Sequence, residues 1–241
     1  MTGYYNRLLE AKETYGDIVA ATDGKESLRY SDLLCAAGEY RRILADMGVL
    51  PGDRVTLCAY NSCSWLKAFF GVVCYGAVAV LMNYSLPESE IMTLMEQMDS
   101  SVFLYGNYGA REKDISSPEH IVRDAAKRFD IESVSFESGK HFEYVPLDES
   151  QYSAPAFVVF TSGSTGSPKG GMLSQKSNIT GADAYAEAIP EMKEESLCMA
   201  VPLFHIFGLG IAVTHLLYGG ELMLPEKFTA EEIDFLLEID E

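Results

Sequence analysis

The alternation of β-rich and helical segments along the whole chain is the feature that most constrains its fold. Runs such as RVTLCAY (54–60) and AFVVF (156–160) are short and apolar. The segments between such runs repeat apolar residues every three or four positions, as amphipathic helices do. Strands joined by helices form mainly parallel sheets whose strands are buried on both faces. The sequence therefore predicts an α/β protein with mainly parallel sheets flanked by helices.

Residues 31–48 carry the clearest helix signals. Ser31 suits the N-cap, Leu33, Ala37 and Leu44 follow helical spacing, and Gly48 suits the C-terminal stop. Pro87 and Ser174 mark the starts of two later helices in the same way. The other expected helices span residues 64–75, 86–101, 117–129, 174–190, 204–220 and 229–241. The other expected strands span residues 77–82, 102–106, 133–136, 196–202 and 221–224.

The stretch AFFGVVCYGAVAVLM (68–82) contains only apolar residues, tyrosine and glycine. It is shorter than the roughly 18–20 residues that span a bilayer. Two glycines interrupt it and its second half is rich in valine, so it is expected to be a buried helix that leads into a buried strand.

A polar stretch at residues 137–153 separates the two halves of the chain. We therefore expect two α/β lobes, the first over residues 1–150 and the second over residues 151–241.

The charge balance narrows the range of partners. The chain has 36 acidic and 18 basic residues, a formal net charge of −18. Such a chain repels nucleic acid and anionic membranes. A small phosphate ester remains possible if amides, hydroxyls, a lysine or a metal ion offset the field locally.

Two features of the sequence favour the cytoplasm. The five cysteines include no C-x-x-C pair, which is typical of thiols in a reducing compartment. The N-terminus is charged and lacks the apolar core of a signal peptide.

The segment FTSGSTGSPKG (160–170) combines glycines, hydroxyls and one lysine between two apolar stretches. Glycines let a backbone approach a ligand, consecutive amides form an anion site, and hydroxyls add donors. Together these groups suit a polyphosphate. The candidate residues for binding it are Thr161, Ser162, Gly163, Ser164, Thr165, Gly166 and Lys169.

The loop does not match the Walker pattern G-x-x-x-x-G-K-[ST]. Counted from Gly163, Pro168 replaces the second glycine and Gly170 replaces the final serine or threonine. The following residues, GGML, have the character of a strand, so no helix N-terminus is expected directly after the loop. An unrelated phosphate-binding enzyme such as a kinase is another possible interpretation of the loop, and the mismatch with the Walker pattern counts against it.

The same loop resembles the phosphate-binding signature of the adenylate-forming superfamily, which includes acyl-CoA synthetases, aryl-CoA ligases, luciferases and peptide-synthetase adenylation domains. The segment GVLPGDRVTLCAYNSCSW (48–65) and the Gly-Ala-Val strand ending at Asn83 are similar to the family's upstream block. VPLFHIFGLG (201–210) is similar to its acyl-pocket segment and favours an acyl- or aryl-CoA ligase.

The resemblance implies a two-step reaction. A carboxylate attacks the α-phosphorus of Mg-ATP to give an acyl-adenylate and pyrophosphate, and a thiol, normally that of CoA, then displaces AMP. The resemblance assigns His205, Phe207 and Gly208 to the acid and acyl pocket. A histidine among apolar residues is also common as a structural residue, and ordinary helix packing would equally explain Phe207 and Gly208. No metal ligand is assigned.

Family members are about twice as long as this chain. The sequence contains no Tyr-Gly-x-Thr/Ser-Glu segment, no later ribose-binding aspartate segment and no small C-terminal domain with its lysine. The expectation is therefore the N-terminal part of an ATP-dependent acyl-CoA synthetase acting on a fatty or aryl acid. The alternative is a non-catalytic, truncated relative that binds only a nucleotide or an acyl ligand.

These absences predict that the 241 residues alone neither adenylate an acid nor form a thioester. The measurement is pyrophosphate release with ATP and a panel of carboxylic acids. Robust release that depends on both ATP and acid would contradict the prediction.

Overall fold

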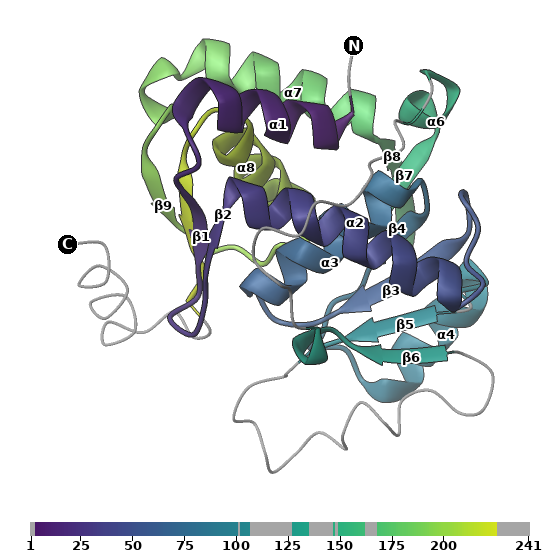
Figure 1. Cartoon of the computed structure of the whole chain (residues 1–241). Coiled ribbons are helices and arrows are strands. Elements are labelled where there is room, and N and C mark those ends of the chain that lie inside the picture. The colour runs from purple at the N-terminus through teal and green to yellow at the C-terminus, as the bar shows by residue number, and fades with distance from the viewer. Residues whose placement is uncertain are drawn as a thin grey trace.

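The computed structural model describes residues 3–100, 102–106, 127–134, 147, 149–161 and 168–225 (Figure 1). The helices are α1 (Tyr4–Tyr15), α2 (Tyr30–Asp46), α3 (Cys63–Tyr75), α4 (Glu88–Met98), α6 (Glu149–Ser153), α7 (Gln175–Ala188) and α8 (Ile206–Leu217), with short 3₁₀ turns η1 (Ile131–Ser133) and η2 (Pro190–Met192). The strands are β1 (Val19–Thr22), β2 (Ser27–Arg29), β3 (Arg54–Cys58), β4 (Val78–Leu81), β5 (Val102–Tyr105), β6 (Lys127–Asp130), β7 (Pro155–Thr161), β8 (Lys169–Ser174), β9 (Ser196–Cys198) and β10 (Glu221–Met223).

The described strands form two sheets. The larger has six strands in the order β6-β5-β3-β4-β7-β8, all parallel except β8, which runs antiparallel to β7. The smaller has four strands in the order β2-β1-β10-β9, in which only the β1–β2 pair is antiparallel. The prediction of an α/β protein with mainly parallel sheets is confirmed.

The sheets do not follow the expected lobe boundary near residue 150. The six-stranded sheet takes β7 and β8 from the second half of the chain, and the four-stranded sheet combines β1 and β2 with β9 and β10. A division of the chain at residue 150 thus cuts through both sheets. The two lobes, residues 1–150 and 151–241, stay a prediction.

Helix α3 lies at the centre of the fold, packed against α1, α2 and strands β3 and β4 (Figure 1). Every residue from Cys63 to Cys74 is buried, as expected for a helix that is apolar on all sides. The prediction of a buried helix followed by a buried strand is confirmed by α3 and β4. No helix in the part of the chain that the structure describes is long and apolar enough to cross a membrane.

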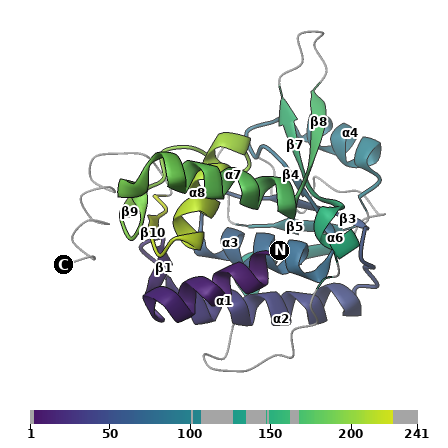
Figure 2. The same ribbon diagram turned by 90° about the horizontal axis from the view of Figure 1, so that it is seen from above.

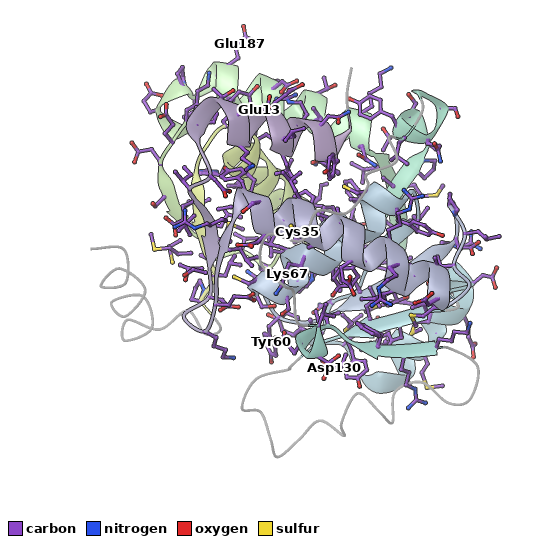
Figure 3. The ribbon with its side chains drawn as sticks, in the orientation of Figure 1. Glu13, Cys35, Tyr60, Lys67, Asp130 and Glu187 are labelled. Atoms are coloured by element: carbon purple, nitrogen blue, oxygen red, sulfur yellow. The ribbon has the colours of Figure 1, made fainter. Side chains whose placement is uncertain are left out.

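Lys67 is the charged residue inside this helix. Its side chain is 3% exposed, and its Nζ lies 2.8 and 2.9 Å from the two carboxylate oxygens of Glu26, which follows β1. Figure 3 marks Lys67 on α3 and Tyr60 on the segment that leads into the helix. The ion pair therefore joins α3 to the β1–β2 turn of the four-stranded sheet.

Helix α1 joins the N-terminus to the second half of the chain (Figure 2). The hydroxyl of Tyr4 donates to Asn178 at 2.7 Å, and its backbone N–H donates to Gln175 at 2.9 Å. Arg7 makes two hydrogen bonds to Asp183 on α7, at 2.8 and 3.2 Å. These contacts place α1 beside α7.

Several expected boundaries were wrong. The N-cap expected at Ser31 is instead Arg29, two residues earlier, whose backbone N–H donates to the Asp32 side chain, so the helix begins at Tyr30. Residues 127–129, expected at the end of a helix, lie in strand β6 (Lys127–Asp130) instead, because parallel pairing with β5 outweighs local helix propensity. The strand expected over 196–202 ends at Cys198, and the helix expected over 204–220 spans Ile206–Leu217.

Two expected elements cannot be compared in full. Residues 133–134 are not in a strand, and the rest of the strand expected at 133–136 lies outside the described residues. The helix expected at 229–241 also lies outside them.

Two glycines, Gly71 at the contact between α2 and α3 and Gly181 on α7, should respond in opposite ways to substitution by alanine. A Cβ at Gly71 would lie 2.3 Å from the Cβ of Tyr40, whereas one at Gly181 on α7 would meet nothing within 4 Å. Gly71→Ala should lower the free energy of unfolding by about 1–3 kcal/mol through overpacking. Gly181→Ala, the matched control, should raise it by about 0.5–1 kcal/mol because alanine favours helix. Urea denaturation measures both, and equal effects would contradict the described packing.

Candidate functional site

Strands β3, β4 and β7 run in parallel, so their carboxyl ends meet at one edge of the six-stranded sheet. Tyr60 and Asn61 follow β3, Tyr84 follows β4, and Thr161 ends β7. Ligands of open α/β sheets bind outside the carboxyl ends of the strands. This carboxyl edge is therefore the first place to look for a site.

The β7–β8 hairpin brings the two ends of the glycine- and hydroxyl-rich loop together. Thr161 pairs with Lys169, and both residues are exposed. The hydroxyl of Thr161 donates to the Lys169 carbonyl at 3.4 Å. Figure 2 shows the two strands extending beyond the neighbouring helices.

The five central candidates for phosphate binding lie outside the described residues: Ser162, Gly163, Ser164, Thr165 and Gly166. The expectation of a strand directly after the loop is confirmed, because β8 begins at Lys169. The next helix begins only at Gln175, where the Ser174 hydroxyl accepts from the backbone N–H of Ser177 as the predicted cap.

A second segment reaches the carboxyl edge from the other sheet. We call Val201–Phe204, which connects β9 to α8, the strap. The Asn61 side chain donates to the Val201 carbonyl at 3.1 Å and accepts from the Leu203 N–H at 2.8 Å. The rings of Tyr84 and Phe204 meet edge to face at 5.3 Å, and Tyr84 also contacts Tyr60 at 4.0 Å between centroids.

His205 is the N-cap of α8. Its Nδ1 accepts from the Phe207 N–H at 3.3 Å, so that nitrogen carries no proton and a neutral ring has its N–H at Nε2. The side chains of His205 and Phe207 are exposed, that of Phe207 to 51%. They are therefore accessible to a ligand.

Gly208 is buried and packs against the strap. A Cβ there would lie 2.3 Å from the Pro202 carbonyl oxygen, so only glycine allows this approach of α8 to the strap. Its assignment to a pocket wall stays a prediction, as do the assignments of the other candidate residues.

The structure thus brings Thr161 and Lys169 together on one hairpin, and His205, Phe207 and Gly208 together at the start of α8. The aromatic contacts from Tyr60 through Tyr84 to Phe204 join the β3 and β4 ends to the residue before His205. Ser62 caps α3, and the side chain of Asn61, the residue before it, binds the strap. No group of three potential metal-binding side chains occurs among the residues described here.

Comparison with known proteins decides the family. The sequence model of the family "AMP-binding enzyme" matches residues 8–240. The chain belongs to this AMP-binding enzyme family.

Similar members of the AMP-binding enzyme family include acyl-CoA ligases. The chain is 26% identical over 210 residues to the long-chain-fatty-acid–CoA ligase FadD13 of Mycobacterium tuberculosis, covering 86% of this chain and 41% of that protein. It is 25% identical over 236 residues to the 2-succinylbenzoate–CoA ligase of Bacillus subtilis, covering 97% of this chain and 46% of that protein. The chain thus spans less than half the length of these relatives.

Solved structures agree on the fold. The B. subtilis O-succinylbenzoate coenzyme A synthetase in complex with ATP and magnesium superposes with a TM-score of 0.77 at 22% identity, covering 100% of this chain and 61% of that one. The N-terminal domain of FACL13 from M. tuberculosis gives a TM-score of 0.76 at 22% identity, with the same two coverages. The fold of the chain is therefore that of the N-terminal region of AMP-binding enzymes.

His215, near the C-terminal end of α8, is expected to make the free energy of unfolding depend on pH. Its side chain is 4% exposed, and Nδ1–H donates to the Ile211 carbonyl at 3.1 Å. Burial lowers its pKa below 6.5. The unfolded state therefore binds the proton first as pH falls, so this contribution to stability is complete above about pH 6.5 and decreases below it.

Urea denaturation between pH 5 and 8 measures this effect. His215→Asn, whose amide can replace the Nδ1–H donor, should reduce the loss of stability below pH 6.5. An unchanged slope in the variant would show that other groups cause the loss.

Proposed function

We propose that the chain is the N-terminal part of an ATP-dependent acyl-CoA synthetase. The intact protein would activate a fatty or aryl carboxylic acid as acyl-AMP, with release of pyrophosphate, and transfer the acyl group to CoA. It would act in fatty acid metabolism in the cytoplasm. The observation that carries the proposal is the hairpin that holds the ends of the phosphate signature, Thr161 and Lys169, at the carboxyl edge of the parallel sheet.

The hairpin supports binding of a polyphosphate. Lys169 is an exposed cation at one end of the loop in a chain with a net charge of −18, so it supplies positive charge locally where a phosphate would bind. Backbone amides and hydroxyls of Ser162–Gly166 would surround the β- and γ-phosphates and stabilise the charge of the leaving pyrophosphate. Mg²⁺ would enter with ATP as part of the substrate, since this ion is commonly bound through substrate phosphates.

The start of α8 supports an acid site. His205 and Phe207 are exposed, next to the aromatic contacts of Tyr84 and Phe204. In the proposal, these side chains and Gly208 line the place of the carboxylic acid. The names of the relatives support CoA as the thiol and both fatty and succinylbenzoyl acids as substrate classes. A partner domain would follow in the same protein.

Binding of MgATP tests the proposal on the chain itself. Thr165→Ala combined with Lys169→Ala removes a hydroxyl and a cation from the loop and should abolish the thermal shift caused by MgATP. In the unmodified chain, MgATP at a hundred times its Kd should stabilise the fold by about 2.7 kcal/mol. The control variant Lys12→Ala with Thr14→Ala removes the same two side-chain groups, a cation and a hydroxyl, from α1 and should leave the thermal shift unchanged.

The whole protein distinguishes the ligase from a protein that only binds. A ligase should release pyrophosphate when given ATP and one acid of a panel, and should form the acyl-CoA when CoA is added. A thermal shift without pyrophosphate release for any acid would favour the non-catalytic relative. A shift that persists in the Thr165/Lys169 variant would contradict the assigned loop.

A further inference from the structure

The strap is held by a side chain that lies far from it in the sequence. Asn61 follows β3 of the six-stranded sheet, while Val201 and Leu203 are 140 and 142 positions later. Its amide group forms one hydrogen bond on each side of Pro202, as donor to Val201 and as acceptor from Leu203. An amide side chain has both a donor and an acceptor, so it pairs with an extended backbone as a neighbouring strand would.

The other side of the strap meets the start of α8. The Pro202 carbonyl accepts from the His205 N–H at 3.0 Å, and the missing side chain of Gly208 leaves room for that carbonyl. The strap is thus fixed between Asn61 and the first turn of α8. Its position sets where His205 and Phe207 stand relative to the carboxyl edge.

The aromatic contacts act on the same segment. Phe204, the last residue of the strap, packs edge to face against Tyr84, which follows the strand next to β7. This contact is apolar and permits sliding, whereas the two hydrogen bonds of Asn61 fix a definite register. Asn61 therefore fixes the hydrogen-bonded register of the strap along the edge.

We propose that Asn61 is a positioning residue for the acid substrate. It would act through the strap, by holding His205 and Phe207 at the distance from the phosphate hairpin that the reacting carboxylate requires. The inference rests on the proposed function, because it assumes that the start of α8 contacts the acid. A displacement of about 1 Å in such a site can reduce the rate about a hundredfold.

The test compares Asn61→Asp with the unmodified whole protein. Aspartate keeps the size and the acceptor for Leu203 but places a carboxylate oxygen against the Val201 carbonyl, so the strap should move. We expect KM for the carboxylic acid to rise about tenfold or more while KM for MgATP stays within twofold. A purely structural role would lower the melting temperature and leave the ratio of the two KM values unchanged.

Tyr4→Phe is the matched control for stability. It removes a buried hydrogen bond to Asn178 that also joins distant parts of the chain. It should lower the melting temperature without changing either KM. Unchanged KM for the acid in Asn61→Asp, in an active protein, would overturn the inference.

Hydrogen exchange reports on the strap independently of activity. In Asn61→Ala the Leu203 amide loses its acceptor and should exchange faster, while the Leu209 amide, which donates to the His205 carbonyl, should keep its rate. Equal protection of Leu203 in both proteins would also overturn the inference. If the unmodified whole protein shows no acid-dependent pyrophosphate release, the proposed function fails and the inference fails with it.

Discussion

The burial of α3 on every side determines how the rest of the structure is arranged. A helix without a solvent-facing stripe must be surrounded, and here α1, α2 and the sheet formed around β3 and β4 enclose it. Because α3 connects β3 to β4, its position fixes where β3 ends and where β4 begins. Asn61 lies between the end of β3 and the start of α3, so the side chain that hydrogen-bonds the strap derives its place from the packing of one apolar helix.

Charge explains why the candidate site depends on so few groups. A chain with a net charge of −18 repels an anion over most of its surface. In the proposed function, binding of a triphosphate would therefore need donors that act at contact distance, namely amides, hydroxyls and Lys169. Such contacts are screened by salt less than a broad basic surface would be once the ligand has excluded water.

The sequence was sufficient to predict the elements whose signals are local. Three features depend only on residues close together in the sequence, and all three occur as expected. They are the apolar helix around Phe69 and Phe70, the helix cap at Ser174 and the strand that begins at Lys169. The partition of the strands between two sheets was not predictable in this way, because β1 pairs with a strand about two hundred residues later. The same reason hides the two hydrogen bonds of Asn61, whose partners lie in a distant segment. It also explains β6, which is a strand because it pairs with β5.

The pairing of β1 with β10 has a consequence for synthesis on the ribosome. Ala21 pairs with Leu222, so the hairpin of β1 and β2 leaves the exit tunnel long before its parallel neighbour exists. At about 5–20 residues per second, this delay lasts about 10–40 s. A two-stranded hairpin is marginally stable by itself in water. The six-stranded sheet, complete at Ser174, is thus available first as a nucleus, and the smaller sheet closes late around it.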